Sequence, residues 1–149
     1  MRTSSLRPRR AEIAFVAVLL GACSSSDADP FDAVHFQQLT GVIFVAQNVV
    51  PVAVMEALFE GRVIPDAAGC LRFDSPDPAT VVWPKGFSIS ESAGMMIVRN
   101  DAGRQIGRIG GTFRLGGGEV SSVQQVSAED RERIETSCPG RYWIVGDVP

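Results

Sequence analysis

The alternation of short apolar runs with glycine and proline predicts a series of β-strands from residue 55 onward. MEALFEGRVIP enters a turn at PDAAG, and CLRF follows as its hairpin partner. ATVVWP ends at a proline, MMIVRN ends before the tight-turn sequence DAG, and YWIVGDV closes the chain. RQIGRIGGTFRLGG places apolar residues among many glycines and adds further strand, whereas KGFSISESAG is rich in turn formers and is interpreted as a turn.

The spacing of these runs indicates an all-β domain with one short helix. Strands that recur about every 8 to 12 residues, with Gly and Pro between them, are typical of small barrels and sandwiches. We therefore expect a small closed barrel of five or six strands, similar to the OB-fold, in which glycines mark bulges and corners. A helix is predicted over Ser127 to Glu135, where Ser127 can cap the first turn and Ile134 would face the barrel, so that the helix lies on it as a lid.

Residues 34–54 are apolar but are interrupted by Gln47, Asn48 and Pro51. Those three residues argue against a membrane span, because unpaired amides are costly in lipid. We interpret this stretch as ordered strand or short helix that packs on the domain, which then covers residues 34–149.

The first 22 residues have the pattern of an export signal. The basic segment MRTSSLRPRR precedes the apolar run IAFVAVLL, which has no polar face. From Ile13 to Ala22 a helix would reach about 15 Å, half of the roughly 30 Å of a bilayer's hydrocarbon core. The run is therefore expected to target the chain and not to span the membrane.

The four residues Leu20-Gly21-Ala22-Cys23 that close this run resemble the lipobox of bacterial lipoproteins. The resemblance implies that Cys23 receives a diacylglyceryl group, that a peptidase cleaves before it, and that membrane lipid is the first partner of the mature chain. An ordinary secretory signal is the alternative. Ser24 follows the cysteine, and in Gram-negative members of this family a residue other than Asp there favours the outer membrane; otherwise the cell membrane is expected.

Residues 23–33 contain Ser, Asp, Ala and Pro with little to bury, so they are predicted to be a flexible tether. Cleavage would also change the charge. Ten of the 14 basic residues and 16 of the 17 acidic residues lie beyond residue 22, which gives the mature chain a net charge of about −6. A domain this acidic is a poor candidate for nucleic-acid binding, since phosphates require a basic surface.

If Cys23 carries lipid, Cys70 and Cys138 remain as an even pair. In an exported protein the oxidising compartment favours a disulfide between them. Such a bond would tie the early hairpin to the closing strand. Two free buried thiols are the alternative, and a redox role is disfavoured because there is no Cys-x-x-Cys motif.

Catalytic and cofactor chemistry find little support in the chain. The single histidine, His35, has no thiol or carboxylate at ligand spacing, so we expect no metal and no other cofactor. The glycine-rich stretch lacks the Lys-Ser/Thr of a phosphate-binding loop, and no Ser stands in G-x-S-x-G. Asp74 and Asp77 are better explained by a rigid turn than by a hydrolase pair. For Glu129 and Asp130, closeness in sequence is no evidence of the facing geometry that a hydrolase pair needs.

The aromatic strings VVWPKGFS and CPGRYWIVG are the most distinctive in the chain. With GCL and LGGGE they resemble a family of secreted and lipid-anchored bacterial domains, over about Gly61 to Val148, and the resemblance implies no activity. One interpretation makes the tryptophans core. The other makes some of the aromatics a surface platform for a sugar or peptide, with Lys85 or Arg141 as polar partner. The candidate ligand-binding residues are Trp83, Phe87, Arg141, Tyr142 and Trp143.

These observations favour a non-enzymatic envelope lipoprotein that acts as a structural or binding module. A binding module for cell-wall glycan or peptide that uses exposed aromatics, or one that binds an envelope protein, is the alternative. A hydrolase that depends on carboxylates alone is less favoured.

Overall fold

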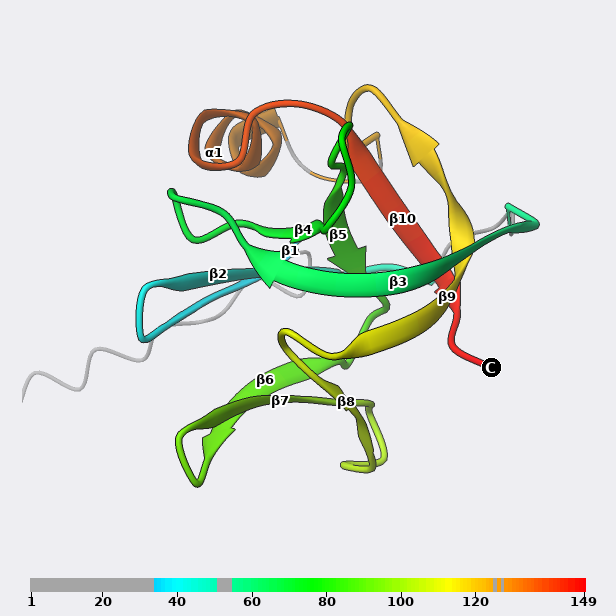
Figure 1. Ribbon diagram of the computed structural model, residues 1–149. Helices are drawn as coiled ribbons and strands as arrows, with labels where there is room; N and C mark the ends of the chain where they lie inside the picture. Colours follow the sequence, from blue (N-terminus) through cyan, green and yellow to red (C-terminus); the bar gives the residue numbers. More distant parts are fainter. Residues whose placement is uncertain (1–33, 51–54, 125, 127) are drawn as a thin grey trace, which may run out of the picture.

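The computed structural model describes residues 34–50, 55–124, 126 and 128–149. The predicted signal, lipobox and tether therefore lie outside the described residues. The described part is mostly β-structure with one helix (Figure 1). Its elements are β1 Val34–Leu39, β2 Val42–Gln47, β3 Ala57–Pro65, β4 Leu71–Phe73, β5 Thr80–Trp83, β6 Ser88–Ser92, β7 Met95–Arg99, β8 Gln105–Arg108, β9 Thr112–Val120, α1 Ala128–Ser137 and β10 Tyr142–Asp147.

Seven strands form the main sheet, in the order β1-β2-β5-β10-β9-β3-β4. A further pairing of β4 with β5 at Arg72 and Thr80 links five of them, β5, β10, β9, β3 and β4, into a ring. The β5–β10 and β2–β5 pairs are parallel, and the other pairs are antiparallel. Figure 1 shows β3 and β9 in front of β5 and β10, with α1 above them at one end.

The hairpin of β1 and β2 extends the sheet beside β5, so residues 34–47 form two strands with a turn between them and no helix. Alternate residues of β2 enter two different cores: Phe44 is buried in one, and Val45 in the other. A strand that is covered on both faces needs apolar residues at every position. This explains the unbroken run VIFVA. Thr40 and Gly41, both with positive φ, make the two-residue turn between the strands.

A second sheet of three strands, β6-β7-β8, lies between β5 and β9 in the chain. The interpretation of KGFSISESAG as a turn was therefore wrong, because Ser88–Ser92 pairs along its length with Met95–Arg99. The hairpin turn is Ala93-Gly94, with φ of 51° and 73°. Two consecutive positive φ values suit the right-handed twist of a hairpin, but Ala-Gly is a weaker signal in sequence than Asn-Gly.

Two apolar cores hold the strands together. The larger core joins the inner residues of the main sheet to β6 and β7, and Trp83 is its largest fully buried side chain. The smaller core lies under α1, whose one buried residue is Ile134, next to Val45 and Val123. The predicted helix is confirmed, with its start at Ala128; Ser127, the predicted cap, is outside the described residues.

Glycine is required in β9 where that strand crosses β10. A Cβ atom on Gly117 would lie 2.1 Å from the carbonyl oxygen of Ile144, and its φ is +156°. The pairing register of β9 with β10 shifts just beyond, between Val145 and Asp147. Gly117 therefore permits the close approach at this irregularity, as expected for glycine within a strand. Within the described ranges, no helix combines the length and the apolar character needed to cross a membrane.

Candidate functional site at the disulfide

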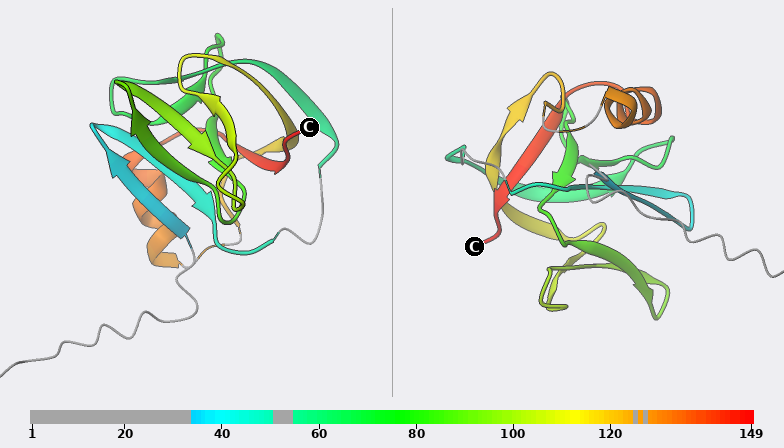
Figure 2. Two further views of the ribbon diagram at one scale, coloured as in Figure 1. Left: turned by 90° about the horizontal axis from the view of Figure 1, so that it is seen from below. Right: turned by 180° about the vertical axis from the view of Figure 1, so that it is seen from behind.

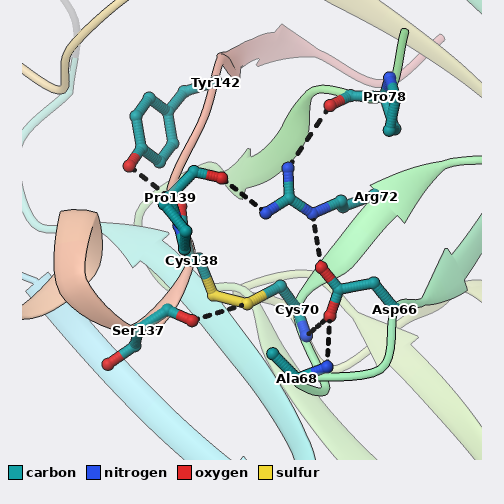
Figure 3. Close-up of a disulfide and its surroundings, with 9 residues drawn as sticks. All are labelled: Asp66, Ala68, Cys70, Arg72, Pro78, Ser137, Cys138, Pro139 and Tyr142. Carbon is teal, nitrogen blue, oxygen red and sulfur yellow. Dashed lines mark hydrogen bonds and ion pairs between the residues drawn. A yellow bond between two sulfur atoms is a disulfide. The ribbon is translucent and has the colours of Figure 1, made fainter.

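The predicted disulfide between Cys70 and Cys138 is confirmed, with a Cα–Cα distance of 5.7 Å. Both cysteines are fully buried in the smaller core. Cys70 directly precedes β4 and forms a parallel bridge with Ile43 of β2, while Cys138 directly follows α1. The bond therefore joins the start of β4 to the connection that leads from the helix into β10 (Figure 3).

Asp66 and Arg72 form a polar network beside the disulfide. One carboxylate oxygen of Asp66 accepts hydrogen bonds of 2.9 Å from the backbone N–H groups of Ala68 and Cys70. The other accepts from Arg72 Nε at 2.6 Å. Arg72 also donates to the carbonyl oxygens of Pro139, at 2.6 Å, and Pro78, at 3.4 Å. One guanidinium thus links the turn before β4, the loop before β5 and the segment after the disulfide.

The charge of Asp66 is favoured by this network. Partial burial opposes its ionisation, but the hydrogen bonds from Arg72, Cys70 and Ala68 outweigh that effect and hold the pKa of Asp66 below its usual value. A carboxylate that accepts several N–H bonds is stabilised in its charged form. Asp66 is therefore a carboxylate at neutral pH.

Tyr142, at the start of β10, is buried next to Cys138. Its hydroxyl donates to the carbonyl oxygen of Cys138 at 2.9 Å. Burial is the main cause that raises the pKa of Tyr142, and the charge of Glu135 adds to it, while Arg72 acts in the opposite direction. The phenol is therefore kept neutral and serves as a hydrogen-bond donor.

A hollow of about 580 Å³, the Tyr142 hollow, opens at the surface above these groups. It is lined by Ser121, Ser122, Arg131, Glu135, Pro139, Gly140 and Tyr142. Ser122 Oγ donates to Glu135 Oε1 at 2.7 Å, and Arg131 Nε donates to the carbonyl oxygen of Val123 at 3.1 Å.

The chemistry of the Tyr142 hollow suits binding. Its carboxylate, Glu135, and its guanidinium, Arg131, can hold a small polar ligand by charge and hydrogen bonds. Across the described ranges, no three His, Cys, Asp or Glu side chains gather where they could hold a metal ion.

The aromatic candidates do not gather into one platform. Trp83 is fully buried, with its ring centroid 5.6 Å from Phe44 and 6.3 Å from the half-buried Phe87. Tyr142 and Trp143 are consecutive in β10 and belong to different cores. Because adjacent strand residues point to opposite faces, these two cannot face one ligand together. Of the predicted ligand-binding residues, only Tyr142 lines the hollow.

Trp143 is half-buried in a second aromatic group. Its ring centroid lies 5.5 Å from Phe73 and 6.3 Å from Phe59, with edge-on geometry in both contacts. The two partly exposed aromatics, Phe87 and Trp143, are thus held by different neighbours.

Arg141, expected as a polar partner of the aromatics, instead pairs with two carboxylates. It contacts Asp77 through one nitrogen and Glu119 through another, the latter at 2.6 Å. Its side chain is about 40% exposed, so each ion pair contributes about 0.2–1 kcal/mol. These contacts join the loop before β5 to β9. Lys85 is exposed.

Sequence reasoning missed the Asp66–Arg72 network. An Asp at the start of a predicted turn is a known signal, because its carboxylate can accept the N–H two residues on. The bond from Arg72 could not be inferred, since it depends on how β4 is placed relative to that turn. The chain matches no protein-family model, and no curated protein or solved structure matches it either.

Proposed function

We propose that this protein is an exported lipoprotein of the bacterial cell envelope, anchored through Cys23, in which the domain is a non-enzymatic structural or binding module. The buried Cys70–Cys138 disulfide carries the proposal. Structural disulfides persist in oxidising compartments and are rare in the cytosol. An exported chain needs a signal, and the one that precedes Cys23 ends in a lipobox-like sequence.

The positions of the distinctive sequence strings in the fold support a module without catalytic residues. In GCL, Gly69 lies against the β1–β2 turn, where a Cβ atom would come within 2.0 Å of the carbonyl oxygen of Gly41. In CPG-x-YW, Cys138 forms the disulfide and the Pro139 carbonyl accepts from Arg72. In GGGE, Glu119 pairs with the arginine of CPG-x-YW. These residues maintain the fold, and none of them is placed as a nucleophile with its base.

The ring of five strands is proposed to be a small closed barrel of OB-like topology. If its strands are counted along the chain, the ring closes in the order first, second, third, fifth, fourth. Only the third and fifth, β5 and β10, are parallel. A five-stranded Greek-key ring of this kind is characteristic of the OB-fold. The β6-β7-β8 sheet is then an insertion between the third and fourth strands.

Binding of a polar ligand of the envelope, such as a wall glycan or peptide, is the second candidate function. The observation in its favour is the Tyr142 hollow, with Arg131 and Glu135 on its wall. The separation of Phe87 from Trp143 argues against the aromatic platform that the sequence suggested. In this case the domain would recognise an envelope partner through charge and hydrogen bonds.

Lipid attachment tests the anchor. The full chain is produced in a lipoprotein-processing bacterium that is fed an alkyne analogue of palmitate, next to Cys23→Ala and, as matched control, Cys70→Ala. Label on the wild type and on Cys70→Ala but not on Cys23→Ala is the expected result. Mass spectrometry should show an amino-terminal peptide that begins at modified Cys23. A mature chain without lipid, or with another first residue, would overturn the anchor assignment.

A further inference from the structure

The exposed large apolar side chains of the described residues concentrate in one short segment. Val49, Val50, Met55 and Leu58 are 43%, 75%, 36% and 52% exposed. The fifth exposed large hydrophobic residue is Met95, in the β6–β7 hairpin. Single exposed apolar residues are ordinary, whereas several together mark an interaction surface. We call these four residues the apolar rim.

Val49 and Val50 of the apolar rim lie next to the start of β1. Val34, the first residue of β1, pairs with Gln47, the last residue of β2, and the rim begins two residues later at Val49. Figure 2 (left) shows the start of β1 and the end of β2 at the same end of their hairpin. Val50 and Met55 are five residues apart, so their Cα atoms are at most about 19 Å from one another.

The length of chain before β1 keeps this end of the domain near the site of the lipid. Ten residues, 24–33, separate Cys23 from Val34. A chain of that length spans at most about 40 Å when extended, and about 18 Å on average when it is flexible. An anchor at Cys23 therefore keeps the start of β1, with Val49 and Val50 next to it, within about 40 Å of the membrane surface.

The charge around the rim favours an apolar contact with lipid over an electrostatic one. Residues 47–59 include no Lys or Arg and one acid, Glu56, which is exposed. Attraction to anionic headgroups requires Lys or Arg; this segment has neither, and Arg114, on β9 beside Leu58, pairs with Glu60. Val and Leu side chains gain free energy when they enter the boundary between headgroups and acyl chains, where a carboxylate can stay at headgroup level.

We propose that the apolar rim contacts the lipid bilayer that carries the anchor, with Val49, Val50, Met55 and Leu58 in the interface. The proposal rests on the proposed lipid anchor at Cys23. The lipid tethers the chain, and the rim fixes which side of the domain faces the membrane.

Tryptophan fluorescence on vesicles tests this contact. The full chain carrying Val50→Trp is purified in detergent from a lipoprotein-processing bacterium and reconstituted into phosphatidylcholine vesicles with brominated acyl chains. Met95→Trp is the matched control, because Met95 is 44% exposed and lies in the second sheet. The wild-type emission of Trp83 and Trp143 is subtracted. We expect Val50→Trp to shift to the blue and to be quenched about twofold or more, as for a residue some 5–10 Å deep in the interface, and Met95→Trp to be unaffected.

The mass of the amino-terminal peptide, measured on the same samples, separates the two proposals. If Cys23 carries lipid and Val50→Trp is quenched no more than Met95→Trp, the rim proposal is overturned and the anchor stands. If Cys23 carries no lipid, the anchor fails; quenching of Val50→Trp on vesicles would then still support the membrane contact, and its absence would overturn both. A blue shift without quenching would mean that protein, such as a second copy, covers the rim, and it would also overturn the proposal.

Discussion

Removal of the Cys70–Cys138 disulfide should cost about 4 kcal/mol of unfolding free energy. The two cysteines are 68 positions apart. Closing a loop of that size lowers the conformational entropy of the unfolded chain by an amount that corresponds to about 4 kcal/mol at 25 °C. A small domain is stable by only about 5–15 kcal/mol in total, so this loss is a large share. The cross-link acts mainly on the unfolded state, and the fold around it should remain recognisable.

Urea unfolding of three samples measures the effect: the oxidised wild type, the wild type reduced in urea and then refolded with reductant, and Cys70→Ala/Cys138→Ala. The reduced wild type keeps both sulfur atoms, so it isolates the cross-link, whereas the double variant also loses buried volume. Both should unfold at lower urea, with a larger m-value because the unfolded chain is more open. A loss below about 1 kcal/mol on reduction would refute the loop-closure reasoning.

Three further predictions concern the surroundings of the disulfide. Asp66→Asn should lower the unfolding free energy by about 1–3 kcal/mol at pH 7, because it removes a charged hydrogen bond to Arg72. The folded-state pKa of Asp66 is depressed, so this difference in unfolding free energy is fully present above the unfolded pKa of about 3.9 and shrinks as pH falls through the folded pKa. Denaturant curves of the wild type and of Asp66→Asn at pH 7 and pH 3 measure the difference. A difference that is the same at both pH values would contradict the assignment. Tyr142 is the single tyrosine, so ultraviolet titration of the phenolate should give a midpoint above 10, and a midpoint at or below 10 would contradict its burial. Gly69→Ala should destabilise the fold at least about twice as much as Gly94→Ala. Both glycines have positive φ, but only at Gly69 would the added Cβ meet backbone, 2.0 Å from the carbonyl oxygen of Gly41. Equal shifts in thermal midpoint would contradict this close approach.

Much of the strand content could be predicted from local patterns. The runs around Val63, Val82, Ile97 and Val145 all lie in strands, because each alternates or concentrates apolar residues between turn signals. The strand at Ser88–Ser92 was missed since its serines resemble a turn, and pairing with β7 decides its conformation. Propensity in a short polar strand is easily overridden by such partners.

The functional site was predictable only in part. The pairing of Cys70 with Cys138 followed from the even number of cysteines that remained after Cys23 was assigned to lipid, and it is confirmed. The placement of the aromatics was not predictable, because Tyr142 and Trp143 are neighbours in sequence but belong to opposite faces of β10. Alternation along a strand is local, but which face becomes core depends on the sheets packed against it.

The sequence by itself determined the strand-rich character of the domain, the disulfide pair and the turn at Asp66, because each depends on short-range pattern or on residue counting. Tertiary structure alone decided the ring order, the burial of Trp83, the link from Asp66 through Arg72 to Pro139, and the position of Val49 and Val50 beside the start of β1. These features join segments tens of residues apart. Their free energy comes from packing and hydrogen bonds that exist only once the strands have paired.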